Sequence, residues 1–218
     1  MTIKNAACWV QTYTLSEKVI IDSIEVYSDA YWNNDGIDIL DSKNVQITNC
    51  NINSADDGIS LKSYLKYQDG SMMCDSIYIA NCSIRSSASA IKFGTASLVG
   101  FKNVEIENIE VYDTYRSAIA LEMIHGGVLE NVSVNGVRAK NTGNAIFMRI
   151  GQQRMHTPPG VLRNIEIKNL KVEVPFERMD YDYVLRGPAL PFFHNIFPSS
   201  ITGLEGHLVE NVRLENIE

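Results

Sequence analysis

The chain has 218 residues, which is enough for a single domain with a substantial buried core. Its formal net charge of −7 disfavours a nucleic-acid partner, because proteins that bind nucleic acids present basic surfaces. Hydrophobic residues make up 45% of the sequence, which indicates a globular protein, yet no apolar run approaches the ~20 residues of a membrane span. We therefore expect neither a nucleic-acid partner nor a membrane partner.

A short strand pattern recurs along nearly the whole chain. It has an aliphatic residue at its second and fourth positions and, in most copies, asparagine at its sixth. The copies begin at Lys18, Asn44, Ser76, Asn103, Asn131, Asn164 and Asn211. Because the intervals between copies vary while the pattern does not, we expect strands of constant length joined by loops of variable length.

A second pattern, Gly/Ala-Ile-x-aliphatic, lies between copies of the first. Its copies begin at Gly36, Gly58, Ala90, Ala118 and Ala145. Alternating strands at such intervals occur in sandwiches, propellers and parallel β-helices. A solenoid gives the best reason for the same residues to return at the same offsets, because its coils stack in register about 4.8 Å apart. The sequence therefore predicts an all-β fold, a right-handed single-stranded parallel β-helix.

The sixth position of the first pattern forms a column of residues that suit a bend. Its members are Ser23, Asn49, Asn81, Asn108, Gly136, Asn169 and Asn216. Asn, Ser and Gly tolerate left-handed backbone conformation, and stacked asparagine amides can form hydrogen-bonded ladders. Cys50 and Cys82 occupy the next column, where we expect neighbouring core thiols in preference to a disulfide.

Both ends of the chain resemble the middle of a strand pattern, and neither shows the cap that a solenoid requires. We therefore expect one domain over residues 1–218, incomplete at both ends and forming an internal or truncated part of a longer solenoid. The proline-rich stretch 175–206 is predicted to be a long surface loop.

The second pattern sorts the polar residues into outward-facing columns. Asp35 and Asp57 both precede a glycine, so they stack on adjacent coils, and Asp56 lies beside them. Carboxylates held close together cannot all ionise freely, so the pKa of one should rise and make it a candidate acid. Two alternatives stay open: aspartate before glycine is common in turns, and a carboxylate cluster can bind calcium.

These segments resemble glycoside hydrolase family 28, the polygalacturonase and rhamnogalacturonan hydrolase family, and the coil pattern does so over nearly all of the chain. Asn33-Asn34-Asp35-Gly36-Ile37-Asp38 is similar to the family's Asn-Thr-Asp-Gly-x-Asp segment, and Asp56-Asp57-Gly58-Ile59 to its Asp-Asp-x-Ile segment. The resemblance implies an inverting hydrolase. In it, Asp56 is the general acid, and Asp35 and Asp57 hold and deprotonate the attacking water.

Two family features are missing from their usual columns. Ser89 stands where the family's polygalacturonases have the histidine of Gly-His-Gly, and Ala120-Leu121-Glu122 stands where they have Arg-Ile-Lys. This departure points toward a pectic or related plant or algal glycan other than simple homogalacturonan, with attack at a chain end as one option. Glu122 is expected to disfavour an anionic sugar. The residues predicted to bind substrate are Asn33, Asp38, Lys62, Lys92, Arg116, Glu122 and Arg149.

The predicted partner is thus a polysaccharide or oligosaccharide, with no cofactor and no metal. A non-catalytic carbohydrate-binding β-helix and a calcium-dependent lyase remain as alternatives. The first residues, Met-Thr-Ile-Lys-Asn, lack the basic segment and apolar core of a signal peptide, whereas the family resemblance implies a secreted or periplasmic protein.

Overall fold

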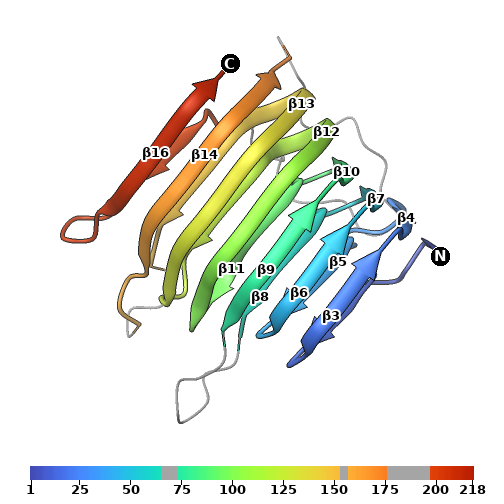
Figure 1. The fold of residues 1–218 in the computed structure, drawn as a ribbon, viewed down its shortest axis with the longest axis horizontal. Helices are drawn as coiled ribbons and strands as arrows, with labels where there is room; N and C mark the ends of the chain where they lie inside the picture. The colour runs from blue at the N-terminus through green and yellow to red at the C-terminus, as the bar shows by residue number, and fades with distance from the viewer. Residues whose placement is uncertain (65–72, 153–156, 176–196) are drawn as a thin grey trace.

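The structure, a computed structural model, describes residues 1–64, 73–152, 157–175 and 197–218. These residues form strands and turns and contain no helix (Figure 1). The named strands pair in parallel, and the two ends of the chain lie at opposite ends of the stack. The prediction of an all-β, right-handed parallel β-helix is confirmed. Within the described part of the chain, no helix has the length and apolar character needed to cross a membrane.

Each coil of the helix contributes to three faces. The first face contains β1 (Thr2–Lys4), β4 (Glu25–Ser28), β7 (Asn51–Ser54) and β10 (Ser83–Ser86). The second face contains β2 (Thr12–Thr14), β5 (Ile37–Leu40), β8 (Ile59–Ser63), β11 (Ile91–Ser97) and β15 (Ser200–Thr202). The third face contains β3 (Glu17–Asp22), β6 (Lys43–Thr48) and β9 (Cys74–Ala80).

Four longer strands run around corners and join these faces. They are β12 (Gly100–Met123), β13 (Val128–Ile150), β14 (Val161–Glu173) and β16 (Val209–Ile217). One strand, β12, pairs with β9 on the third face, β10 on the first and β11 on the second. The predicted loop 175–206 lies mostly outside the described residues, and its last part contains the strand β15.

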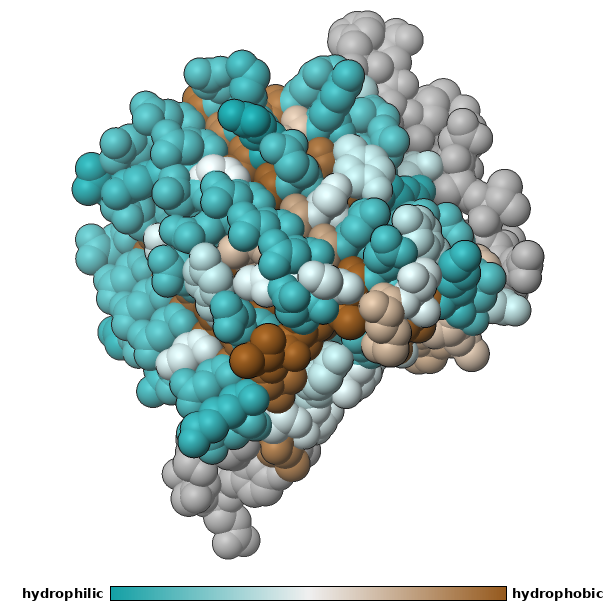
Figure 2. Space-filling model, turned by 45° about the vertical axis from the view of Figure 1, so that its right-hand side comes forward, coloured by the Kyte–Doolittle hydropathy of each residue, from teal (hydrophilic) through white to brown (hydrophobic). Residues whose placement is uncertain are grey.

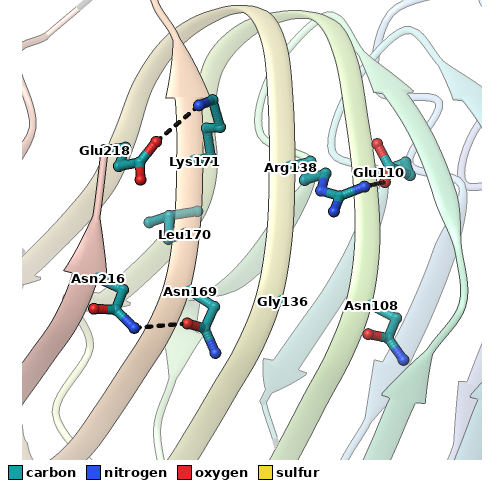
Figure 3. A pocket seen from close by; sticks show the side chains of 9 residues that line it. All are labelled: Asn108, Glu110, Gly136, Arg138, Asn169, Leu170, Lys171, Asn216 and Glu218. Atoms are coloured by element: carbon teal, nitrogen blue, oxygen red, sulfur yellow. Dashed lines mark hydrogen bonds and ion pairs between the residues drawn. The ribbon is translucent and has the colours of Figure 1, made fainter.

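The corner between the third and first faces is built by the predicted asparagine column. All its members have positive φ, from 52° at Asn108 to 78° at Gly136. The amides also form ladder hydrogen bonds, for example from Asn216 Nδ2 to Asn169 Oδ1 at 3.0 Å (Figure 3). Both expectations for this column are confirmed. Gly136 interrupts the ladder, and a hollow of about 500 Å³ opens there, bordered by surface ion pairs such as Glu110–Arg138.

A second left-handed column is present that the sequence pattern does not predict. The opening residue of the first pattern has positive φ in every copy, including Lys18 at 59° and Ser76 at 59°. Its asparagines form their own ladder, in which Asn131 donates to Asn103 and Asn211 donates to Asn164. The sequence does not indicate this column, because two of its members are a lysine and a serine, and neither residue type is typical of left-handed backbone.

The core fills the inside of the coils with the aliphatic positions of both patterns. Ile37, Ile59 and Ile91 of the second face, for example, have no solvent exposure. Cys50 and Cys82 are buried free thiols, as predicted. Outward-facing residues are mostly hydrophilic, with apolar residues visible between them (Figure 2). The second face differs from this pattern, because β5 and β8 are buried on both sides.

Candidate active site

The turns that lead into β5 and β8 hold the aspartates in register. The Gly36 amide donates to the Asp57 carbonyl at 2.9 Å, and the Gly58 amide donates to the Ser89 carbonyl at 2.9 Å. Both glycines are required by close packing, since a Cβ at Gly36 would lie 2.5 Å from Ile52 Cγ2 and 2.6 Å from the Gly58 carbonyl oxygen. The glycines are therefore structural, whereas the aspartate side chains beside them are directed into a charged cluster.

Asp35, Asp38 and Lys62 form the first group of charges, which we name the Lys62 cluster. The Lys62 ammonium contacts Asp35 Oδ2 and Asp38 Oδ1 at short range. The three side chains are buried, and Asp38 has no solvent exposure. Trp9 lies over the ammonium, 4.4 Å from Nζ to the ring centroid, so a cation–π contact covers the lysine.

Asp57, Lys92 and Glu122 form the second group, the Lys92 cluster. Lys92 Nζ lies 3.1 Å from Glu122 Oε1 and 3.6 Å from Asp57 Oδ2. Asp57 Oδ1 also accepts a 3.1 Å hydrogen bond from the Ser89 amide. Lys92 thus joins charges from three consecutive coils, and the backbone of Ser89 fixes the orientation of the Asp57 carboxylate.

Asp56 lies between these groups and differs from the other carboxylates. It is half-buried, and its Oδ1 accepts a 3.0 Å hydrogen bond from the Asp57 amide. Among the described residues, no lysine or arginine nitrogen lies within ion-pair distance of it. Burial, Asp57 and Asp35 raise the pKa of Asp56 to about 7, while Lys92 and Arg116 act in the opposite direction.

Burial also shifts the titration of the Lys62 cluster. It raises the pKa of Asp35 to about 7, together with the charges of Asp57 and Asp38 and against the effect of Lys62. It raises the pKa of Asp38 to about 6, again against Lys62. Burial opposes the charged form of Lys62, yet the carboxylates around it hold its pKa above the ordinary value. The carboxyls of Asp35, Asp38 and Asp56 therefore titrate as a coupled group near neutral pH.

The predicted substrate-binding residues fall into two sets. Lys92, Arg116, Glu122 and Arg149 come together around a pocket of about 270 Å³ on the second face. Asp38 and Lys62 are instead buried within the Lys62 cluster, where their charged groups contact each other. Asn33 lies at the surface, where its side chain contacts Trp9 Nε1 at 3.4 Å and Cys8 Sγ at 3.2 Å.

The structure shows a partner for Glu122 that the sequence does not indicate. Its Oε1 lies 3.1 Å from the Lys92 ammonium, which also contacts Asp57, and the expectation that Glu122 disfavours an anionic sugar stays a prediction. Position in a column cannot reveal such a pairing, because it depends on how far a long side chain reaches across coils.

Three residues that were not predicted as part of the site, Asn144, Phe147 and Phe197, line the same pocket. The strand register could have placed the first two at the site, because Asn144 pairs with Ser117 and Phe147 pairs with Ala120. Phe197 has no such signal, since its carbonyl reaches Asn144 Nδ2 across 53 residues of sequence.

Within the described residues, no group of three or more His, Cys, Asp or Glu side chains is arranged to hold a metal ion. The position between Asp35 and Asp38 is taken by the Lys62 ammonium. A cation bound there would have to displace the lysine.

Comparisons with known proteins agree with this architecture. Residues 1–86, which include the three aspartates and Lys62, match the family model of glycosyl hydrolases family 28. A hyperthermoactive exopolygalacturonase from Thermotoga maritima has a similar fold, with a TM-score of 0.74 and 24% identity over 99% of this chain and 46% of its own. No curated protein sequence gave a significant match.

Two further solved structures share the fold. A polygalacturonase from Erwinia carotovora ssp. carotovora aligns with a TM-score of 0.64 and 16% identity over 99% of this chain and 51% of its own. A family 28 exopolygalacturonase from Yersinia enterocolitica aligns with a TM-score of 0.66 and 16% identity over 100% of this chain and 42% of its own. The chain therefore spans about half the length of the structures it matches.

The chain thus forms a right-handed parallel β-helix similar in fold to these solved polygalacturonases, and a carboxylate cluster lies on its second face. The resemblance to glycoside hydrolase family 28 is confirmed, by the family model over residues 1–86 and by the fold over the described chain.

Proposed function

We propose that this protein is a glycoside hydrolase that cleaves a pectic or related plant or algal polysaccharide with inversion at the anomeric carbon. The observation that carries the proposal is that neighbouring carboxylates differ in whether a lysine ammonium contacts them. Lys62 bridges Asp35 and Asp38, and Lys92 bridges Asp57 and Glu122. Asp35 and Asp56 both have pKa values of about 7, but Asp35 is held by Lys62, whereas Asp56 is bridged by neither lysine and is the one free to deliver its proton to a substrate.

In the proposed reaction, Asp56 is the general acid. Its carboxyl proton passes to the glycosidic oxygen as the bond between that oxygen and the anomeric carbon breaks. A water molecule attacks the anomeric carbon from the opposite face, and its proton passes to the carboxylate of Asp57, assisted by Asp35. One water is consumed, two sugar products form, and the proton taken up by the base returns through solvent to Asp56.

The two lysines have a defined part in this scheme. The Lys62 ammonium favours the ionised forms of Asp35 and Asp38 against the effect of burial, and the Lys92 ammonium lies 3.6 Å from Asp57, the proposed base. Neighbouring carboxyls whose surroundings differ in this way divide the acid and base roles between them. Lys92 also lines the pocket beside the proposed reaction centre, together with Arg116 and Arg149.

The test is an assay of reducing-end release on a panel of pectic and algal polysaccharides. We expect turnover by the parent chain, with the anomer first released being inverted in proton NMR spectra. Asp56→Asn should lower kcat by about 10²–10⁴, the usual contribution of a positioned general acid. The matched control is Asp29→Asn, which changes an exposed aspartate and should leave kcat unchanged.

Three results would contradict the proposal. Equal activity of Asp56→Asn and the parent would remove the acid from the scheme. Calcium-dependent release of unsaturated, ultraviolet-absorbing products would identify a lyase. Glycan binding by a well-folded chain, with no turnover anywhere in the panel, would identify a non-catalytic carbohydrate-binding protein.

A further inference from the structure

The pocket on the second face lies beside the aspartates and shares Lys92 with them. Its volume is about 270 Å³, just below the range typical of drug-sized ligands. Asn144, Phe147 and Phe197 line one part of it, and Arg116, Glu122 and Arg149 line another. Lys92 also lies 3.6 Å from Asp57, so the pocket adjoins the proposed reaction centre.

Asn144 presents an unused hydrogen-bond acceptor in this pocket. The residue is only 3% exposed, and its Nδ2 donates to the Phe197 carbonyl at 2.9 Å. Its Oδ1 is buried and has no hydrogen-bond donor among the described residues. A buried acceptor without a partner costs roughly 1–3 kcal/mol, so a ligand hydroxyl that donates to it would gain affinity.

An aromatic pair stands next to this acceptor. The rings of Phe147 and Phe197 stack at 5.8 Å with an interplanar angle of 28°. Phe197 is 49% exposed even though it belongs to a pocket. An aromatic surface beside a single oriented polar group suits a sugar ring, because a pyranose has an apolar C–H face and hydroxyl groups at its edge.

The charges of the pocket are less suited to being the main recognition element. Lys92 already contacts the carboxylates of Asp57 and Glu122. Arg149 lies at the exposed rim, and Arg116 is not without an interaction partner. A ligand carboxylate would therefore interact with solvated or already paired cations, where ion pairs contribute little.

We propose that this pocket is a subsite for one pyranose residue of the substrate. The residue is held by its apolar face against Phe147 and Phe197 and by a hydroxyl that donates to Asn144 Oδ1. Recognition does not depend on a carboxylate. This inference rests on the proposed function, since it assumes that the ligand is a glycan.

The experiment measures binding in the Asp56→Asn background, so that ligand is not consumed. The probes are galacturonate oligosaccharides of one to three units and their carboxyl-reduced galactose counterparts, titrated by calorimetry. Phe147→Leu should weaken both series by about tenfold, which corresponds to about 1.4 kcal/mol of lost stacking. Phe147→Tyr keeps the ring and should keep the affinity. Tyr112→Leu, which removes an exposed aromatic at the first-face part of β12, is the matched control.

Several outcomes would overturn the subsite. One is unchanged affinity of Phe147→Leu for both series, with Phe147→Tyr confirming that the site is intact. Another is selective loss of the acidic series in Arg149→Gln while Phe147→Leu has no effect, because the carboxylate would then be the recognised group. Failure of both series to bind the Asp56→Asn chain would also overturn it.

The proposed function is tested by a separate measurement, the turnover of polysaccharide by the parent chain. Turnover of polysaccharide by the parent, combined with unchanged binding in Phe147→Leu, would remove only the subsite. Binding that depends on Phe147 without turnover by the parent would remove only the hydrolase.

Discussion

The Lys62 cluster and the Lys92 cluster each combine one lysine with two carboxylates, but their surroundings differ. Lys62 joins two carboxylates of the preceding coil, whereas Lys92 joins one carboxylate from each of the two adjacent coils. Lys62 lies under the Trp9 ring, and its partner Asp38 is fully buried. Lys92 borders a pocket, and its partner Glu122 keeps 14% of its side chain exposed.

This difference indicates separate roles for similar charges. A covered ammonium can only fix the position and ionisation of its carboxylates, so Lys62 is a positioning residue. An ammonium at the edge of a pocket can do this and also reach a bound sugar. The Trp9 ring over Lys62 and the pocket beside Lys92, and not the exposed fractions of the two lysine side chains (8% and 10%), thus distinguish the cluster that can contact substrate.

The largest expected effect that separates the clusters is on stability. Lys62→Met should lower the free energy of unfolding by about 3–5 kcal/mol, because it leaves buried carboxylates without a counter-charge. Lys92→Met should cost about 1–3 kcal/mol, since Asp57 keeps its hydrogen bond from Ser89 and Glu122 has access to water. Urea denaturation at pH 7.5 measures both. Lys102→Met, at a more exposed ion pair, is the control, with an expected cost below about 1 kcal/mol. Equal losses in the two cluster variants would abolish the distinction.

The next effect is a fall in stability as pH rises. The carboxyls of Asp35, Asp38 and Asp56 have folded-state pKa values of about 7, 6 and 7, above the value of about 3.9 expected in the unfolded chain. Between about pH 4 and 7 the folded state therefore holds protons that the unfolded state has released. The free energy of unfolding should decrease over this window by up to about 1.4 kcal/mol per pH unit for each proton.

Asp38→Asn sharpens this prediction for the Lys62 cluster. It removes one titrating group and one negative charge beside Asp35, so the slope of stability against pH should flatten. Denaturation midpoints from pH 4.5 to 7.5 measure the slope, and Asp29→Asn, at an exposed position, is the control. A slope that is unchanged in Asp38→Asn, or that rises with pH in the parent, would contradict the assignment.

The smallest effect concerns the cover over Lys62. Trp9→Leu removes the cation–π contact and should lower the free energy of unfolding by about 1 kcal/mol. Sugar binding at the Phe147 pocket should stay unchanged, because Trp9 does not line it. Thermal unfolding and calorimetric titration test the two halves. A loss of sugar affinity in Trp9→Leu would show that the two regions are coupled.

The repeat pattern was a sound guide to the backbone. In a solenoid each coil stacks on the previous one, so equivalent sequence positions become neighbours in space. The asparagine column at the corner and the stacking of Asp35 on Asp57 followed from this rule alone. The left-handed column at Lys18 and Ser76 did not, because its residue types vary while its φ does not.

Side-chain partners lay beyond that rule. Register placed Asp38, Lys62 and Lys92 on the outward side of the second face, but it did not show that each lysine bridges two carboxylates. Long side chains cross from coil to coil, and the contacts they choose depend on burial and on the charges already present. Trp9 and Phe197 reach the site from segments 53 residues away from Lys62 and Asn144, respectively.

From its letters alone this chain specifies a parallel β-helix and places three aspartates on one outward face, since periodicity sets which residues stack. Only the folded molecule decides that Asp56 is bridged by neither lysine, that Lys62 is covered and that Lys92 opens onto a pocket. The physical reason is that stacking is local and repeats with the chain, whereas desolvation and charge pairing depend on everything that surrounds a side chain.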